Sequence, residues 1–148
     1  MENVTKSYEL TLTRKNNNSF EKVKINSSTK AAEYIRRFYH EDIEIYESFF
    51  ILLLNNSLET IGYAKISQGG LTSTVVDVRI ICKYAIDSLA VNVMIAHNHP
   101  SGTLRPSEAD HQITKKIKNA LNLLDINLTD HIILTTESYY SFRDNGDI

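Results

Sequence analysis

The sequence contains little cysteine and proline and no long apolar segment, and each of these shortages excludes a class of protein. A single cysteine, Cys82, cannot form an internal disulfide or build a cysteine-rich zinc site, which is typical of a reducing cytoplasm. The longest apolar run, Phe49–Leu54, is far shorter than the roughly 20 residues that cross a bilayer. No charged-then-apolar leader opens the chain. We therefore expect a cytoplasmic protein with no membrane partner.

The chain also lacks a strong charge of either sign. Its 16 Lys and Arg residues against 18 Asp and Glu residues give a formal net charge of -2, which provides no general attraction to nucleic acid. Three lysines on one predicted helix, Lys115, Lys116 and Lys118, are a weak footprint for nucleic acid, which stays possible only through association. Apolar residues make up 42% of the 148 residues, enough for the core of one compact domain. Nothing in the composition specifies an oligomeric state.

Hydrophobic periodicity predicts strands and helices that alternate along the chain. Alternating patterns predict a hairpin over residues 7–25, and Ser27 or Ser28 is placed to cap a helix that ends near His40. Asp77 is placed to cap a second helix whose apolar side runs to Leu89, and a third helix begins near Ser107. The order of the elements predicts a mixed α/β fold. The predicted strands cover residues 47–54, 58–67, 91–96 and 132–134, the third of them central and buried on both faces.

Two histidines and an aspartate carry the spacing of a metal site. His97 and His99 lie two residues apart, so on an extended chain both rings project from the same face. Gly102 suits a loop that reverses the chain and returns the next helix over the end of the strand. On that helix Asp110 precedes Ile113 by three residues, which places its carboxylate on the core-facing side. Two imidazoles and one carboxylate make the open three-ligand site of catalytic zinc, although other divalent ions accept the same ligands.

A purely structural interpretation competes with this one. Ser107 and Asp110 have the spacing of a capping box, and Ser-x-x-Asp at a helix start often means only a satisfied N-terminus. Two histidines with this spacing and no third ligand are also more commonly packed in the core or exposed than bound to a metal. In random order, however, the combination with Asp110 has a probability of roughly 1%. The joint pattern therefore favours a metal site.

The pattern His97-x-His99 with Pro100, followed by Ser107-x-x-Asp110, resembles the JAMM motif of the MPN+ (JAB) metallopeptidases. Within that superfamily, residues 97–102 and 130–133 and the string Tyr140-Ser141-Phe142 resemble the RadC-like branch. The resemblance covers about residues 44–146. It implies an MPN/JAB fold, a curved mixed β-sheet flanked by helices with a cytidine-deaminase-like architecture.

The resemblance also implies how the chain is organised. Residues 44–148 would form the RadC-like MPN+ (JAB) domain. Outside the resemblance, the periodicity of residues 1–43 predicts an N-terminal hairpin and helix, which we expect to pack on the core of that domain and give one compact domain overall. Full-length members usually carry an N-terminal helix-hairpin-helix region, and residues 1–40, which contain no glycine, do not resemble it.

The roles that the resemblance implies belong to five residues. Zinc would be bound by His97, His99 and Asp110, and an amide or isopeptide bond of a peptide or protein conjugate would be hydrolysed by activated water. Glu47 is the residue that looks equivalent to the family's glutamate, a general acid/base, with Glu44 as its nearest rival. The hydroxyl of Ser107 would stabilise the tetrahedral oxyanion.

Two other functions stay open at this point. The first is metal-dependent hydrolysis of phosphodiesters, because the RadC-like branch is customarily linked by name to DNA repair. The second is a non-catalytic binding module that zinc only stabilises.

Three further residues receive structural interpretations. We expect His131 to be structural rather than an additional ligand, Asn98 to bond the loop that follows it, and Cys82 to belong to the core.

Overall fold

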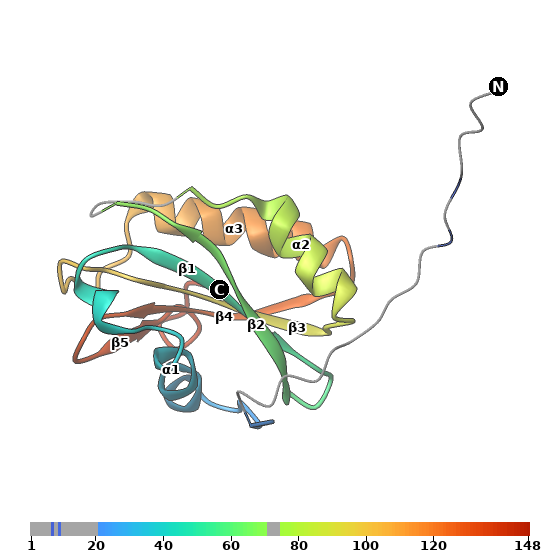
Figure 1. The fold of residues 1–148 in the computed structure, drawn as a ribbon, viewed down its shortest axis with the longest axis horizontal. Helices are drawn as coiled ribbons and strands as arrows, with labels where there is room; N and C mark the ends of the chain where they lie inside the picture. Colours follow the sequence, from blue (N-terminus) through green and yellow to red (C-terminus); the bar gives the residue numbers. More distant parts are fainter. Residues whose placement is uncertain (1–6, 8, 10–20, 71–74) are drawn as a thin grey trace, which may run out of the picture.

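A five-stranded mixed sheet forms the centre of the molecule (Figure 1). The computed structural model describes residues 7, 9, 21–70 and 75–148. The strands follow the order β2-β1-β3-β4-β5, and the pairs are antiparallel except for β3 with β4, which run parallel. This confirms the predicted mixed α/β class. The strands are β1 (Ser48–Leu54), β2 (Thr60–Gln68), β3 (Asn92–Asn98), β4 (Asn127–Leu134) and β5 (Tyr139–Ser141).

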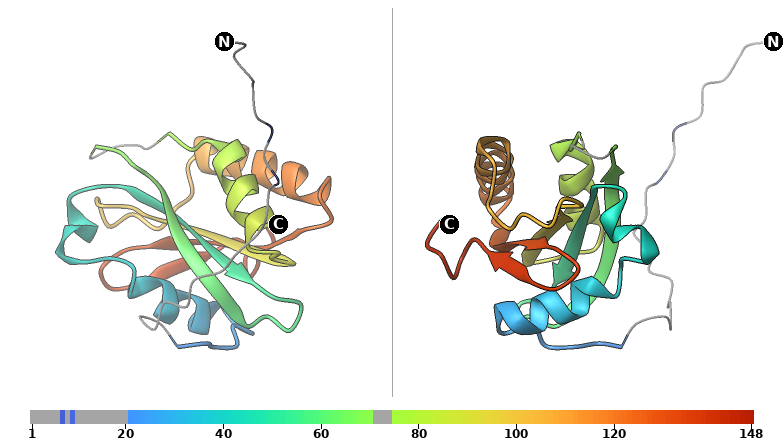
Figure 2. Two further views of the ribbon diagram at one scale, coloured as in Figure 1. Left: turned by 45° about the vertical axis from the view of Figure 1, so that its right-hand side comes forward. Right: turned by 90° about the vertical axis from the view of Figure 1, so that its left-hand side faces the viewer.

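In the described part of the chain, three α-helices cover the two faces of the sheet, and each begins at the capping side chain that the sequence predicts. Ser27 caps α1 (Ser28–Arg36), Asp77 caps α2 (Val78–Asp87), and Ser107 caps α3 (Glu108–Asn122). Helix α1 lies on one face and α2 and α3 lie on the other, as Figures 1 and 2 show together. A short 3-10 helix, η1 (Glu41–Glu44), leads from α1 into β1.

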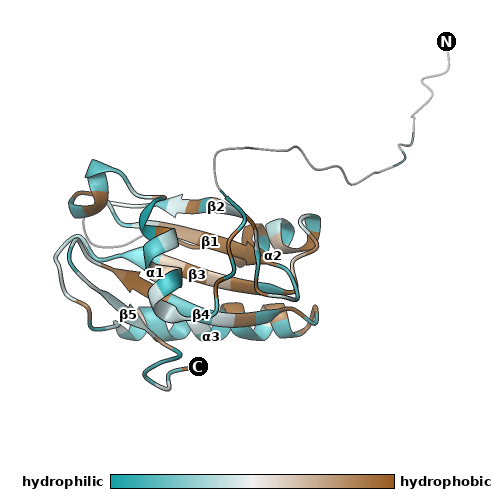
Figure 3. Cartoon of the chain, turned by 90° about the horizontal axis from the view of Figure 1, so that it is seen from below, coloured by the Kyte–Doolittle hydropathy of each residue, from teal (hydrophilic) through white to brown (hydrophobic). Residues whose placement is uncertain are grey.

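The sheet separates two hydrophobic cores because alternate residues of each strand point to opposite faces. Phe50, Leu52 and Leu54 of β1 pack against α1, while Phe49, Ile51 and Leu53 pack against α2 and α3. Every residue of β1 and of β3 is buried, and apolar residues concentrate in these central strands (Figure 3). On β3, Val93 and Ile95 face α2 and α3, so the alternation directs His97 to that same face.

Most of the hairpin predicted over residues 7–25 lies outside the described residues, and Lys24 makes an isolated antiparallel bridge with Glu59. Strand β4 begins at Asn127, earlier than the predicted range of 132–134. The apolar side of the second helix does not extend as far as predicted, since Ile86 and Leu89 are 49% and 63% exposed. The helix ends at Asp87, and Leu89 adopts a left-handed conformation with φ of 56° that turns it away from the stripe.

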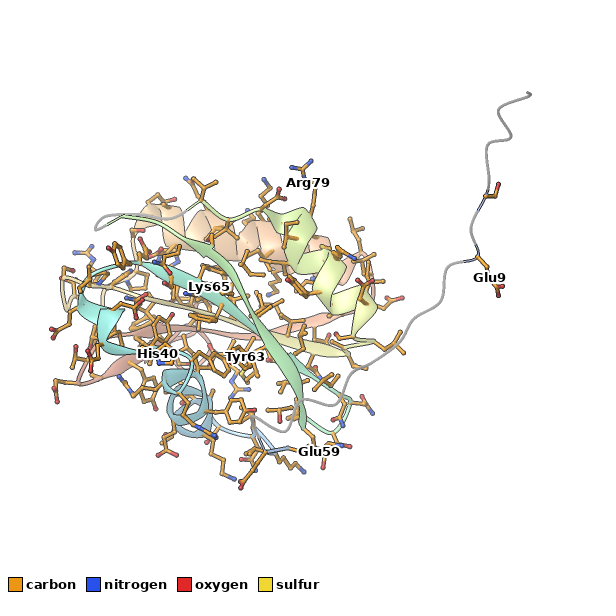
Figure 4. The ribbon with its side chains drawn as sticks, viewed as in Figure 1. Glu9, His40, Glu59, Tyr63, Lys65 and Arg79 are labelled. Carbon is orange, nitrogen blue, oxygen red and sulfur yellow. The ribbon has the colours of Figure 1, made fainter. Side chains whose placement is uncertain are left out.

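Side-chain contacts also attach β2 to the segment that follows α1 and to β1. Tyr63 of β2 lies on the side of α1 (Figure 4), where its ring stacks on Phe38 with centroids 3.9 Å apart. Lys65, on the same strand, places its ammonium group 5.5 Å from the centre of the Phe50 ring.

Among the helices in the described part of the chain, none is both long and apolar enough for a membrane crossing.

The packing of α3 against the sheet predicts a contrast between two leucines at its end. Leu121 is fully buried, whereas Leu123 is 87% exposed. Leu121→Ala should lower the free energy of unfolding by about 2–5 kcal/mol, because it leaves a cavity in the core. Leu123→Ala, the matched control, should change it by less than about 0.5 kcal/mol. Urea denaturation of both variants measures the difference, and similar losses in the two would contradict this packing.

Candidate metal centre

The end of β3 places two imidazole rings side by side. The ladder with β4 continues past β3, since the backbone N–H of His99 donates to the carbonyl of Leu134 at 2.9 Å. His97 and His99 therefore sit on one extended segment with both rings on the same face. Their Nε2 atoms lie 2.9 Å apart. This arrangement is the one that the i, i+2 spacing predicts.

The first turn of α3 brings a carboxylate to both rings. Asp110 is 8% exposed, and its Oδ1 lies 3.2 Å from Nε2 of His97 while its Oδ2 lies 3.3 Å from Nε2 of His99. The same Oδ2 accepts the backbone N–H of Ser107 at 2.8 Å, and Oγ of Ser107 accepts the N–H of Asp110 at 3.1 Å. Capping and contact with the histidines, competing interpretations of the sequence, thus coexist in one side chain.

A second carboxylate enters from the residue that precedes β1. The register pairs Phe49 with His97, so Glu47 lies opposite His99 when the antiparallel pairing is extended. Its Oε1 lies 3.7 Å from Nε2 of His97, and the residue is 8% exposed. The rival Glu44 is exposed in η1 and accepts a hydrogen bond from Thr136 instead. Of these two glutamates, the structure brings Glu47 to the cluster.

Asn98 fixes the segment that carries this carboxylate. Its amide donates to the carbonyls of Ile43 and Tyr46 at 2.6 and 2.8 Å, and its Oδ1 accepts the N–H of Ser48 at 2.8 Å. These bonds bracket Glu47 on both sides. We expected Asn98 to bond the loop after β3, but its side chain bonds the segment before β1, because the pleat directs Asn98 to the face opposite the histidines.

The four side chains fit a metal ion by their donor atoms and by their separations. One ligand atom from each of Glu47, His97, His99 and Asp110 lies within 4.8 Å of all the others. Two ligands of a tetrahedral zinc ion at 2.0–2.1 Å lie about 3.3 Å apart, and Nε2 of His97 lies 2.9, 3.2 and 3.7 Å from the nearest atoms of His99, Asp110 and Glu47, on both sides of this distance. The cluster could therefore hold a divalent ion.

The loop after β3 prepares His99 for this role. Gly102 has φ of 84°, a conformation suited to glycine, and its N–H closes a turn onto the carbonyl of His99. The turn places the carbonyl of Thr103 2.6 Å from Nδ1 of His99. A carbonyl only accepts, so Nδ1 carries a proton, and whenever the ring is neutral its Nε2 lone pair faces the cluster.

Burial and the neighbouring groups shift the pKa values of three residues in the cluster, in different directions. Burial raises the pKa of Glu47, and the two histidines only partly offset it. Burial would also raise the pKa of Asp110, but the bonds to His97 and His99 outweigh it and hold that pKa far below its usual range. For His99, burial acts to lower the pKa, and the contacts with Asp110 and Thr103 raise it overall. The pocket thus attracts positive charge, which a divalent cation supplies.

Two buried residues lie behind His97, outside the group of four. Nδ1 of His97 is 2.8 Å from Nε2 of His131 on β4, and Nδ1 of His131 is 2.6 Å from Oγ1 of Thr114 on α3. Full burial lowers the pKa of His131 well below its ordinary value. His131 thus lies behind His97 and outside the group of four, where we expected a structural residue rather than an additional ligand. Sequence reasoning missed Thr114, whose only signal is its position one helical turn after Asp110.

The cluster opens into a cavity of about 590 Å³. Ser107 lines it beside the four clustered residues, and Arg105 is a cationic residue at its wall. A cavity of this size accepts a few residues of a peptide or a small ligand. Its apolar wall consists of Phe49, Val76, Pro100, Ala109 and Ile113.

Known proteins are similar to this sequence over two thirds or more of its length. A UPF0758 protein of Flavobacterium johnsoniae is 50% identical over 101 residues, which cover 68% of this chain and 44% of the relative. A UPF0758 protein of Streptococcus gordonii is 37% identical over 130 residues, covering 88% of this chain and 57% of the relative. The chain thus spans about half the length of these relatives. The model of the RadC-like JAB domain family matches residues 25–147, and the chain belongs to that family.

Proposed function

We propose that this chain is a zinc-dependent hydrolase of the JAMM type that cleaves an amide or isopeptide bond. The observation that carries the proposal is the convergence of two imidazoles and two carboxylates at one cavity. Zinc is the metal we propose, because two histidines and one aspartate leave a coordination position open for water. Family membership supports the same reading.

The bound zinc would supply a Lewis acid that lowers the pKa of water toward neutrality. Glu47, the carboxylate furthest from the imidazoles, would accept the proton of the attacking water and deliver it to the leaving amine. Its contact with His97 is 3.7 Å, longer than either contact of Asp110. The raised pKa that burial gives it favours a group able to hold a proton between these two transfers.

Ser107 would donate a hydrogen bond to the oxyanion that forms on the substrate carbonyl. Its Oγ acts as an acceptor in the helix cap, where the N–H of Asp110 is the donor. The hydroxyl proton is not used in that bond, so one side chain can cap α3 and donate to a substrate oxygen at the same time.

The substrate class we propose is a peptide or a protein conjugate. The cavity beside the cluster combines apolar and polar lining residues, which suits a peptide chain with apolar side chains. A phosphodiester substrate would demand a concentration of positive charge, and the chain has a formal net charge of -2.

Metal analysis tests the zinc site directly. Protein purified without chelator should contain about one equivalent of zinc, and His99→Ala should lose it, because removal of one of three ligands leaves too few. His111→Ala is the control, since His111 neighbours Asp110 in sequence and lies outside the cluster of four. Elemental analysis of the three proteins checks the expectation. Full zinc occupancy in His99→Ala would overturn the assigned ligands.

Replacement of the proposed acid/base tests the reaction. Glu47→Gln should retain zinc and lose turnover of peptide or isopeptide conjugates by about 10²- to 10⁴-fold, because the amide cannot transfer the proton. Glu44→Gln, three residues earlier and exposed, is the matched control and should keep full activity.

The same assays separate the competing functions. Cleavage of labelled DNA that chelation abolishes, with no cleavage of any peptide conjugate, would indicate a phosphodiesterase. Loss of structure on chelation with no hydrolysis of either substrate would indicate a module that zinc only stabilises. Full turnover by Glu47→Gln would remove the mechanism.

The bonds of Asn98 predict a loss of activity that stability does not explain. Asn98→Ala should lower the free energy of unfolding by about 1–3 kcal/mol for the partners left unsatisfied, and it should also lower turnover because Glu47 loses its support. Asn92, buried at the opposite end of β3, bonds to Asn55 and Asn127 and gives the matched control. Asn92→Ala should be destabilised with its turnover unchanged. Equal turnover in the two variants, measured beside urea denaturation, would contradict this role.

A further inference from the structure

A line of four groups runs from the first turn of α3 to the proposed zinc site. The carbonyl oxygen of Asp110 is 2.6 Å from Oγ1 of Thr114, which is 2.6 Å from Nδ1 of His131. Nε2 of His131 is in turn 2.8 Å from Nδ1 of His97. Thr114, His131 and His97 are each at most 1% exposed. Water therefore has little access to these three contacts.

The protons of this line can be assigned by counting. A carbonyl oxygen has no proton, so the short contact between Asp110 and Thr114 is a hydrogen bond only if the hydroxyl donates to it. With its single proton used, Oγ1 of Thr114 can only accept, and Nδ1 of His131 must be the donor. Nε2 of neutral His131 then accepts, and Nδ1 of His97 must carry the proton.

Two other arrangements fail on physical grounds. In the reversed arrangement the hydroxyl of Thr114 would donate to His131, which leaves two oxygens 2.6 Å apart with no proton between them. A doubly protonated His131 would also satisfy Thr114, but it would place a full charge in a completely buried ring. That ring stacks on Phe142 with centroids 4.4 Å apart, and no carboxylate contacts its nitrogens in the described part of the chain.

We propose that Thr114 and His131 are positioning residues that set the tautomer of His97, so that its Nε2 lone pair faces the zinc site. The inference rests on the proposed function, because it needs His97 to be a zinc ligand. His99 obtains the same tautomer directly from the carbonyl of Thr103. For His97 the acceptor is Nε2 of His131. A relay formed by His131 and Thr114 connects this acceptor to the backbone carbonyl of Asp110, another proposed ligand. The relay thus links two ligands through groups that never touch the metal.

Two variants interrupt the relay at different points. Thr114→Val removes the hydroxyl at nearly constant volume, and His131→Phe keeps a ring against Phe142 but removes both nitrogens. Each should weaken zinc binding about 10- to 100-fold, because the tautomer of His97 is no longer imposed. Thr114→Ser retains the hydroxyl and should bind zinc as the unmodified protein does. His111→Phe is the control for the ring replacement, since His111 also packs on Phe142, with centroids 5.3 Å apart, and takes no part in the relay.

The experiment has two readouts. Competition with a chromophoric chelator gives the zinc Kd of each protein, and NMR of isotopically labelled histidine in the metal-free protein shows which ring nitrogen carries the proton. We expect His97 and His131 of the unmodified protein to carry it on Nδ1. A proton on Nε2 of His97 with none on Nδ1 would overturn the relay, as would a folded Thr114→Val with unchanged Kd and unchanged tautomers.

These readouts also separate failure of the relay from failure of the proposed function. If the unmodified protein binds no zinc, the proposed function fails, and the tautomer of His97 still decides the relay. If either variant does not fold, as judged by circular dichroism, the tautomers of the unmodified protein decide it alone.

Discussion

Acceptor atoms forced together at one end of the sheet are the constraint on which the rest of this structure depends. Behind Nδ1 the rings of His97 and His99 contact His131 and the carbonyl of Thr103, and their Nε2 atoms lie 2.9 Å apart. Glu47 and Asp110 add two carboxylates to the same space. Acceptors that face one another in a half-buried pocket destabilise a fold unless positive charge lies between them. Positive charge, carried by protons on the histidines or by a bound cation, can therefore stabilise this cluster.

The groups that stabilise the fold are also the groups that hold this cluster. The carboxylate of Asp110 closes the capping box of α3 and contacts both histidines, while Asn98 joins the segment before β1 to the strand that carries them. A cluster carried on a helix and on paired strands keeps its geometry better than one carried on loops. Here the hydrogen bonds of the helix start and of the sheet supply that rigidity, so changes at these residues affect stability and geometry together.

Signals that act within a few residues were sufficient for much of the fold. Side-chain caps located the starts of the three helices, and apolar runs located β1 and β3, because these interactions join neighbours in sequence. The end of α2 was predicted less well, since the left-handed turn at Leu89 has no signal in a stripe of apolar residues. Asn98 was assigned to the wrong segment for a related reason, because its partners lie about 50 residues away.

The sequence alone determined which chemistry could occur, through the spacing of His97 and His99 on one strand and of Ser107 and Asp110 in one helical turn. Tertiary structure decided which distant groups join them. The antiparallel register of β1 with β3 selects Glu47 over Glu44, and the parallel pairing of β3 with β4 places His131 behind His97. Spacing within one element follows from the geometry of the backbone, whereas register between strands depends on how both faces of the sheet are buried.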